Sequence, residues 1–220
     1  MTRPDRLAEV ARAAETGDVL ALTKVLRSGE KAIERKAAAK ALGKIGGAGV
    51  VEPLGAALHD ESKGVHEAAA SALAGIGGDR AVELLADALR RELHPDPDID
   101  GAALVTIGGP KVTEILIAAL AGDYLWTRWA AAEALGKLGD PIAVMPIITL
   151  LRDKEPAVRG GAALALGELG DPVAVEPLIA VLRDEESTVR RAAAKVLRTM
   201  DDPRAVEPLA RARAKDPYLY

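Results

Sequence analysis

The chain has 220 residues, a length at which folding buries about 70 to 75 per cent of the surface that the unfolded chain exposes. Its 29 basic and 33 acidic residues give a net charge of −4, so no overall positive field draws the chain to nucleic acid or to an anionic membrane. The absence of cysteine excludes disulfides, thiolate metal ligands and cysteine nucleophiles.

Export and membrane insertion are not expected. The N-terminal residues MTRPDRLAEV contain no apolar signal region. The longest apolar run, residues 142–151, is too short to span a bilayer and contains Pro146. We therefore expect a cytoplasmic protein without a membrane partner.

Two helices are expected at the N-terminus. Leu7, Val10 and Ala14 share one helical face, and a second helix is expected over residues 19–26 after a break at Gly17 and Asp18. This pair is slightly out of phase with the sequence that follows it. We therefore interpret residues 1–29 as an N-terminal capping pair.

From residue 30 to residue 200 the sequence repeats every 31 residues. One apolar residue in a phrase that reads ALGKLGDP in its clearest copy recurs at this interval. The residues concerned are Ile45, Ile76, Ile107, Leu138, Leu169 and Met200. Such regular spacing indicates that each copy is one structural unit.

Each copy is predicted to contain two helices. In the last copy the first helix has one apolar stripe, formed by Val189, Ala193, Val196, Leu197 and Met200. This helix is expected to end at glycine, as at Gly139, and an Asp-Pro pair such as Asp140 and Pro141 then caps the second helix. Pro177 and its equivalents lie in the first turns of the second helix, where they predict a bend or a late start.

A pair of short helices with one apolar stripe each cannot bury a core alone, so neighbouring pairs must stack. The pattern therefore predicts an all-α fold, a right-handed α-solenoid of about fourteen short helices in about seven pairs. We expect a single domain over residues 1–220, with repeats over 30–200 and a polar C-terminal cap over 201–220.

The phrases VRRAAAKVLR and LGELGDPVAVEPLIAVLRD resemble the HEAT-like repeats named after phycobilisome lyases, and related phrases cover essentially the whole chain. The resemblance implies an armadillo-like superhelix in which the first helix of each pair lines a concave groove, where its variable positions meet ligands. The family includes bilin lyase subunits, a metal-dependent peptidyl-lysine hydroxylase and many binding scaffolds, so the fold leaves the function open.

A metal centre is not expected. The hydroxylase relatives carry repeated His-Glu pairs, whereas this chain has one, His66 and Glu67. A di-iron centre needs several ligands from different helices, and neither His59 nor His94 precedes a glutamate. His66 occupies a position that holds arginine in other copies, so we interpret it as a polar substitution and predict no cofactor. The arginines are Arg35, Arg128, Arg159 and Arg190.

The stretch DPDIDG, residues 96–101, has the order of the first half of a calcium-binding loop. Its carboxylates are Asp96, Asp98 and Asp100. A complete loop would place Ile107 where the bidentate glutamate belongs, so we favour an eroded repeat and leave cation binding open. Asp100 falls where the other copies have core alanines, and a buried carboxylate needs a partner. Either the helix starts late with Asp100 at its cap, or Asp100 pairs with a neighbour such as Arg128.

No catalytic residue is predicted. The glycine-rich phrase GKIGGAG, residues 43–49, follows no strand and lacks the spacing of a phosphate-binding loop. Serine, histidine and aspartate are too scattered along the chain to indicate a hydrolase triad.

The aromatic residues point to a binding face. Tyr124, Trp126 and Trp129 all lie within the phrase DYLWTRWA. A helical wheel places Trp126, Trp129, Glu133 and Lys137 opposite the predicted core stripe of this helix. Two exposed tryptophans one turn apart are typical of a binding hot spot, although packing against an irregular neighbouring copy or a second chain is the alternative.

Charges along the same face favour a protein partner. The face has basic ends and an acidic, aromatic middle, whereas a nucleic-acid backbone requires a continuous basic track. The basic ends are Lys36, Lys40 and Lys44, and Arg191 and Lys195; the acidic positions include Glu67, Asp98 and Glu133. We predict a non-catalytic scaffold that binds a peptide or protein segment, and no nucleic acid, in its concave groove. The alternative is a bilin-lyase-like subunit that holds a tetrapyrrole for attachment to a partner protein. The oligomeric state is not predicted.

Overall fold

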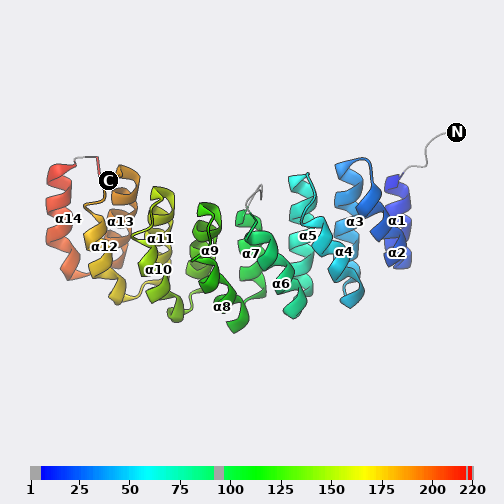
Figure 1. The fold of residues 1–220 in the computed structure, drawn as a ribbon, viewed down its shortest axis with the longest axis horizontal. Coiled ribbons are helices and arrows are strands. Elements are labelled where there is room, and N and C mark those ends of the chain that lie inside the picture. Colours follow the sequence, from blue (N-terminus) through cyan, green and yellow to red (C-terminus); the bar gives the residue numbers. More distant parts are fainter. Residues whose placement is uncertain (1–5, 92–96, 217, 220) are drawn as a thin grey trace. The chain divides into compact units, whose positions relative to one another are not determined.

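The computed structural model describes residues 6–91, 97–216 and 218–219. In these ranges the chain forms fourteen α-helices and three short 3-10 helices and contains no strand, so the predicted all-α fold is confirmed. Figure 1 labels the helices in chain order. The chain divides into two compact units, Met1–Ile107 and Gly108–Tyr220.

The helices of unit 1 lie in two layers. Their bounds are α1 Arg6–Thr16, α2 Val19–Ser28, α3 Ala32–Ile45, α4 Val51–Ala57, α5 Lys63–Ile76, α6 Gly78–Leu89 and α7 Pro97–Ile107, with the 3-10 helix η1 at Ala48–Val50. The first helices of successive pairs, α1, α3, α5 and α7, pack side by side (Figure 1), and the second helices form the other layer. Fully buried leucines such as Leu42, Leu54 and Leu73 belong to the core that these layers share.

Unit 2 repeats this arrangement. Its helices are α8 Pro110–Ala119, α9 Leu125–Leu138, α10 Val144–Leu150, α11 Pro156–Leu169, α12 Val175–Val181, α13 Ser187–Met200 and α14 Pro203–Lys215, with η2 at Pro141–Ala143 and η3 at Pro172–Ala174. The first helices α9, α11 and α13 pack side by side. Gly136 lets α9 approach α11 closely, because a Cβ at this position would lie 3.0 Å from the Cα of Ala165.

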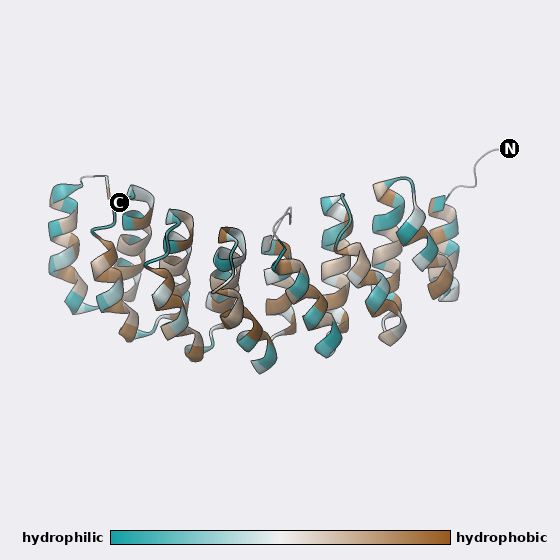
Figure 2. Ribbon diagram, viewed as in Figure 1, coloured by the Kyte–Doolittle hydropathy of each residue, from teal (hydrophilic) through white to brown (hydrophobic). Residues whose placement is uncertain are grey.

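The helices are amphipathic. Figure 2 shows hydrophobic and hydrophilic residues on the same helices in both units. In α13 the predicted apolar stripe is buried at Val189, Ala193, Val196 and Leu197 and partly buried at Met200. Within the described ranges, none of the helices combines the length and the hydropathy that crossing a membrane requires.

The predicted helix ends are confirmed in the clearest copy. Gly139 follows α9 with a left-handed φ of +70°. The Asp140 side chain then accepts a hydrogen bond from the Ile142 amide at 3.1 Å and caps η2. Pro146 is the third residue of α10, a position where its missing N–H has no partner within the helix. The second helix therefore starts late, after a 3-10 turn.

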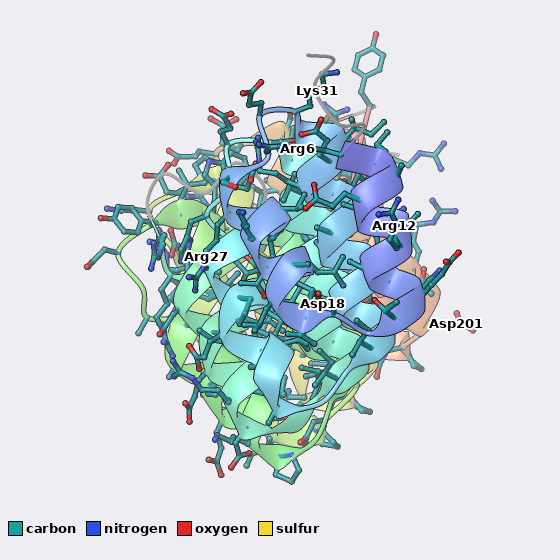
Figure 3. The ribbon with its side chains drawn as sticks, turned by 90° about the vertical axis from the view of Figure 1, so that its right-hand side faces the viewer. Arg6, Arg12, Asp18, Arg27, Lys31 and Asp201 are labelled. Atoms are coloured by element: carbon teal, nitrogen blue, oxygen red, sulfur yellow. The ribbon has the colours of Figure 1, made fainter. Side chains whose placement is uncertain are left out.

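The predicted break between the first two helices is also confirmed. Gly17 has a φ of +69°, and Asp18 accepts a hydrogen bond from the Ala21 amide at 3.0 Å at the start of α2 (Figure 3). Arg6, labelled in the same view, donates to the Ser28 carbonyl at 2.9 Å and so links the start of α1 to the end of α2. The capping roles of residues 1–29 and 201–220, and the single domain, stay predictions.

Four arginines, three of them buried and Arg190 partly buried, join successive helix pairs. Arg128 donates from Nε and Nη2 to the two carboxylate oxygens of Asp153 at 2.7 and 2.9 Å, and from Nη1 to the carbonyls of Gly122 and Asp123. Asp153 also accepts from the Glu155 amide. We call the full set the arginine ladder, which comprises Arg35–Asp60, Arg128–Asp153, Arg159–Asp184 and Arg190–Asp216. Each arginine ties the loop before its own helix to the segment after the second helix of the same pair.

The arginine ladder predicts a loss of stability at acid pH. Burial alone would raise the pKa of Asp184, but hydrogen bonds from Arg159 and from the Glu186 amide outweigh burial and lower this pKa. The folded-state pKa therefore lies below the unfolded value of about 3.9. Asp184 stabilises the fold above that pH, and its contribution is lost as the pH falls through the folded-state pKa. The pKa values of Asp60 and Asp153 are lowered in the same way.

Urea unfolding between about pH 7 and about pH 3 measures this dependence. We expect a nearly constant unfolding free energy down to about pH 5 and a steep fall below about pH 4. Asp184→Asn should be less stable than the parent chain at neutral pH. It should also lose less stability on acidification, because position 184 no longer has a carboxylate to protonate. Glu168→Gln, at an exposed carboxylate of α11 outside the ladder, is the control and should follow the parent curve. Equal acid dependence in Asp184→Asn and the parent chain would contradict the role of the ladder.

Candidate functional site

His66 takes the place of a ladder arginine in α5 and is fully buried. Its Nδ1 lies 2.8 Å from the Leu58 carbonyl at the end of α4, and its Nε2 lies 3.1 Å from Oδ1 of Asp100 on α7. The Leu58 carbonyl can only accept, so the Nδ1 N–H of His66 donates to it, while Nε2 faces Oδ1 of Asp100. His66 therefore keeps a hydrogen bond to the segment before its own helix. Its carboxylate partner, however, lies on α7, the first helix of the next pair.

The expectation that Asp100 caps a late-starting helix is wrong, whereas the expectation that it pairs with a neighbour is confirmed, with His66 and not Arg128 as the partner. Asp100 lies inside α7, which begins at Pro97, and not at a helix cap. Arg128 pairs with Asp153 of its own repeat and does not serve Asp100. At the position where the ladder would supply an aspartate to His66 the chain has Arg91, and the buried carboxylate comes from Asp100 instead.

The His-Glu pair does not form a metal site. His66 faces the core, whereas the neighbouring Glu67 is exposed, so the two side chains do not converge. Across the part of the chain that the structure describes, no group of three or more His, Asp or Glu side chains is placed to hold a metal ion. Asp96 lies outside the described residues. Residues 97–107 form α7 with Asp98 exposed in its first turn, an arrangement that fits an eroded repeat and not a calcium loop.

Trp126 and Trp129 form the centre of the candidate site on α9. Their ring centroids lie 6.2 Å apart at an interplanar angle of 80°, an edge-to-face contact. Trp126 is 56% exposed. Trp129 is only partly exposed, which corrects the expectation of two exposed indoles. Its indole lies on Gly161 of α11, because a Cβ at this glycine would stand 2.5 Å from Trp129 Cδ1.

The apolar surface continues from α9 onto α11. Leu164 is 44% exposed, and Gly160 has open space above its Cα. Gly160 and Leu164 lie one repeat after Trp129 and Glu133, on helices that pack side by side. We call Trp126, Trp129, Gly160 and Leu164 the aromatic face. The sequence analysis did not predict that α11 contributes to this surface. The pair Gly160 and Gly161, one repeat after Trp129 and Ala130, could have indicated it, because glycine leaves room for a neighbouring side chain.

Charged side chains border the aromatic face. Glu133 and Lys137, one turn apart on α9, form an ion pair. The remaining predicted residues are exposed, and they are Tyr124 before α9, Arg191 and Lys195 on α13, and Glu67 and Asp98 in unit 1. The structure therefore brings together two pairs of the predicted binding residues, the two indoles and the Glu133–Lys137 ion pair, on one side of α9.

A substitution at Gly161 tests how the aromatic face is held. Alanine normally stabilises a helix interior by up to about 1 kcal/mol relative to glycine, but here its Cβ would overlap the Trp129 indole. We expect Gly161→Ala to shift the tryptophan emission and to yield less than this stabilisation. Gly160→Ala is the matched control, because a Cβ there meets open space, so it should stabilise the fold and leave the emission unchanged. Identical emission in both variants would contradict the packing of Trp129 on Gly161.

The buried His66–Asp100 pair predicts a compensating set of substitutions. Asp100→Ala should cost about 3 to 5 kcal/mol of unfolding free energy, because it leaves His66 buried without its carboxylate. Asp98→Ala, at an exposed carboxylate of the same helix, should change it by about 0.5 kcal/mol or less. The triple variant His66→Arg, Arg91→Asp, Asp100→Ala recreates a ladder pair and should recover most of the loss in urea unfolding. A triple variant less stable than Asp100→Ala would show that this repeat cannot accept the ladder.

Comparison with known proteins identifies the repeats. The family model for HEAT repeats matches residues 19–99 and 144–220, and the model for the PBS lyase HEAT-like repeat matches residues 127–153. No curated protein is detectably similar to the chain.

Several solved structures are similar to the chain. Human deoxyhypusine hydroxylase in complex with glycerol is 23% identical with a TM-score of 0.48, over 91% of this chain and 81% of that one. A complex of CpcE and CpcF of phycocyanin lyase from a Nostoc species is 21% identical with a TM-score of 0.44, over 100% of this chain and 91% of that one. An engineered protein is 24% identical with a TM-score of 0.45, over 83% of this chain and 96% of that one. Because the HEAT repeat model covers well over half of its residues, the chain belongs to the HEAT repeat family.

Proposed function

We propose that the chain is a non-catalytic binding module and that the aromatic face of unit 2 binds a peptide or protein segment. HEAT repeats form a fold suited to protein interaction, because stacked helix pairs present long rows of side chains that the core does not need. The main observation behind the proposal is that Trp126 is exposed and contacts Trp129 edge to face. Trp129 in turn packs on Gly161.

The indoles supply contact area at low entropic cost. Trp126 touches Trp129 edge to face, and Trp129 is held between α9 and α11, so little side-chain freedom is left to lose on binding. Leu164 extends the apolar surface, and the bare backbone at Gly160 allows a partner chain to approach closely. Such a surface favours an aliphatic or aromatic anchor on the partner.

The bordering charges determine orientation in this proposal. The Glu133–Lys137 ion pair lies on the exposed side of α9 and offers one acceptor and one donor at the rim of the aromatic face. Tyr124, Arg191 and Lys195 are proposed as flanking contacts in unit 2. Glu67 and Asp98 belong to unit 1, and their contribution, like the cytoplasmic location, stays a prediction.

A tetrapyrrole ligand is the second proposal for the same surface. It is favoured by the two nearly perpendicular indole rings, of which one is more than half exposed, because an exposed indole can stack on the conjugated pyrrole rings of an open-chain bilin. Mixing the protein with a bilin would change the visible absorption spectrum and quench the tryptophan emission. An unchanged visible spectrum would leave the protein segment as the ligand of the aromatic face.

Trp126→Ala tests the principal proposal. Peptides are first selected against the parent chain from a display library, and their affinities are then measured with both proteins. We expect a loss of about thirtyfold or more in affinity, the effect of removing a hot-spot tryptophan worth about 2 kcal/mol. The fold should be unaffected, because the side chain is more than half exposed.

Ile142→Ala provides the control for this measurement. Ile142 is 64% exposed in the same unit but lies in η2, outside the aromatic face, so its removal should leave the affinity within about twofold. Selected peptides that bind Trp126→Ala and the parent chain equally well would sink the proposal that this face is the binding site.

A further inference from the structure

A second concave surface lies in unit 1, between α3 and α5. It is a groove of about 450 Å³. Lys36, Lys40 and Lys44 line it from α3, and Glu67 and Ser71 are among the residues that line it from α5. We call this surface the lysine groove. Residues four apart on a helix rise by about 6 Å, so the three ammonium groups form a row along the groove.

The lysine row forms no ion pair among the residues that the structure describes. By contrast, Lys137 on α9 is paired with Glu133. Lys40 and Lys44 are exposed and Lys36 is partly exposed, so all three can meet a ligand. Among the residues that line the groove, Glu67 is the one acidic side chain.

The start of α5 adds to the positive potential at one end of the row. Lys36 reaches over Gly64, since a Cβ on this glycine would lie 3.2 Å from the Lys36 Nζ. The first turn of α5 has no acidic residue, so the positive end of its helix dipole faces the same region. An ammonium group beside a helix N-terminus is stabilised when an anion binds between them.

Small residues form the floor of the groove. A Cβ on Gly43 would stand 2.6 Å from the Cβ of Ala72, so α3 and α5 pack at backbone distance there. On the α5 side the groove is lined by the small residues Ala68, Ala72 and Gly75, which project little into it. A partner helix has a diameter of about 10 to 12 Å with its side chains, whereas an extended chain can lie along the small residues with its backbone close to them.

We propose that the lysine groove binds an extended acidic peptide segment with carboxylates at every second residue. Alternate side chains of an extended chain lie about 6.6 to 6.8 Å apart on one face, close to the spacing of about 6 Å along the lysine row. Each of three such carboxylates can therefore meet one lysine. The site lies in unit 1 and shares no residue with the aromatic face, so either proposal can fail alone.

The lining residues favour a peptide over single-stranded nucleic acid. Binding of single strands relies on aromatic side chains that stack on the bases, and no aromatic residue lines the groove. Glu67 and the net charge of −4 act against any polyanion, so the preference for a peptide rests on the lack of stacking side chains among the lining residues.

The test measures the binding of a fluorescein-labelled peptide of alternating glutamate and serine by fluorescence anisotropy. Replacing the lysine row by Lys36→Gln, Lys40→Gln and Lys44→Gln should weaken binding about tenfold or more, the loss expected for three exposed ion pairs. The control variant Lys24→Gln, Lys154→Gln, Lys215→Gln removes the same charge from exposed lysines outside the groove and should change the affinity by about twofold or less. Glu67→Gln removes the repelling carboxylate and should tighten binding, a gain that misfolding cannot imitate.

Three results would overturn the proposal. The first is that the peptide does not bind the parent chain. The second is that both triple variants lose the same affinity, because binding would then follow net charge alone. The third is that a labelled oligouridylate competes for the lysine row and binds more tightly than the peptide, which would assign the groove to nucleic acid.

Discussion

Each buried guanidinium of the arginine ladder must satisfy its N–H donors, because an unpaired buried charge is very costly. Arg159 does this by donating to both oxygens of Asp184 and to the carbonyls of Asp153 and Lys154. The two carbonyls lie before α11, the helix that carries Arg159, and Asp184 lies after α12, the second helix of the same pair. The hydrogen bonds of one guanidinium therefore fix where a helix pair begins and where it ends. The regular stack, and the row of first-helix faces it presents, depend on this constraint.

That regularity frees other positions for binding. The core takes the small and apolar residues on one side of each first helix, and the ladder joins successive pairs, so the exposed side is not needed for folding. Unit 2 carries its two tryptophans there, and unit 1 carries a row of lysines that form no ion pair among the described residues. In both places a glycine on an adjoining first helix accommodates the functional side chain, Gly161 under Trp129 and Gly64 beside Lys36.

Much of the fold could be predicted from sequence because it rests on local rules repeated at a fixed interval. Glycine ends, aspartate caps and late-starting second helices recur in copy after copy, so each copy supports the others. The pairing of His66 with Asp100 could not be read in this way, because it joins two departures from the repeat that are 34 residues apart. The partial burial of Trp129 was readable in principle. Gly161 stands where other copies have Ala37, Ala68, Ala130 and Ala192, one residue beyond the repeat of that indole.

In the proposed function, a bound partner covers the aromatic face. The chain has two tryptophans and both lie in this face, so their quenching by acrylamide reports on the site directly. With a bound peptide or protein partner that itself contains no tryptophan, we expect a clear decrease in quenching, because Trp126 becomes buried. A partner that binds tightly while the quenching stays unchanged would show that the binding surface lies elsewhere.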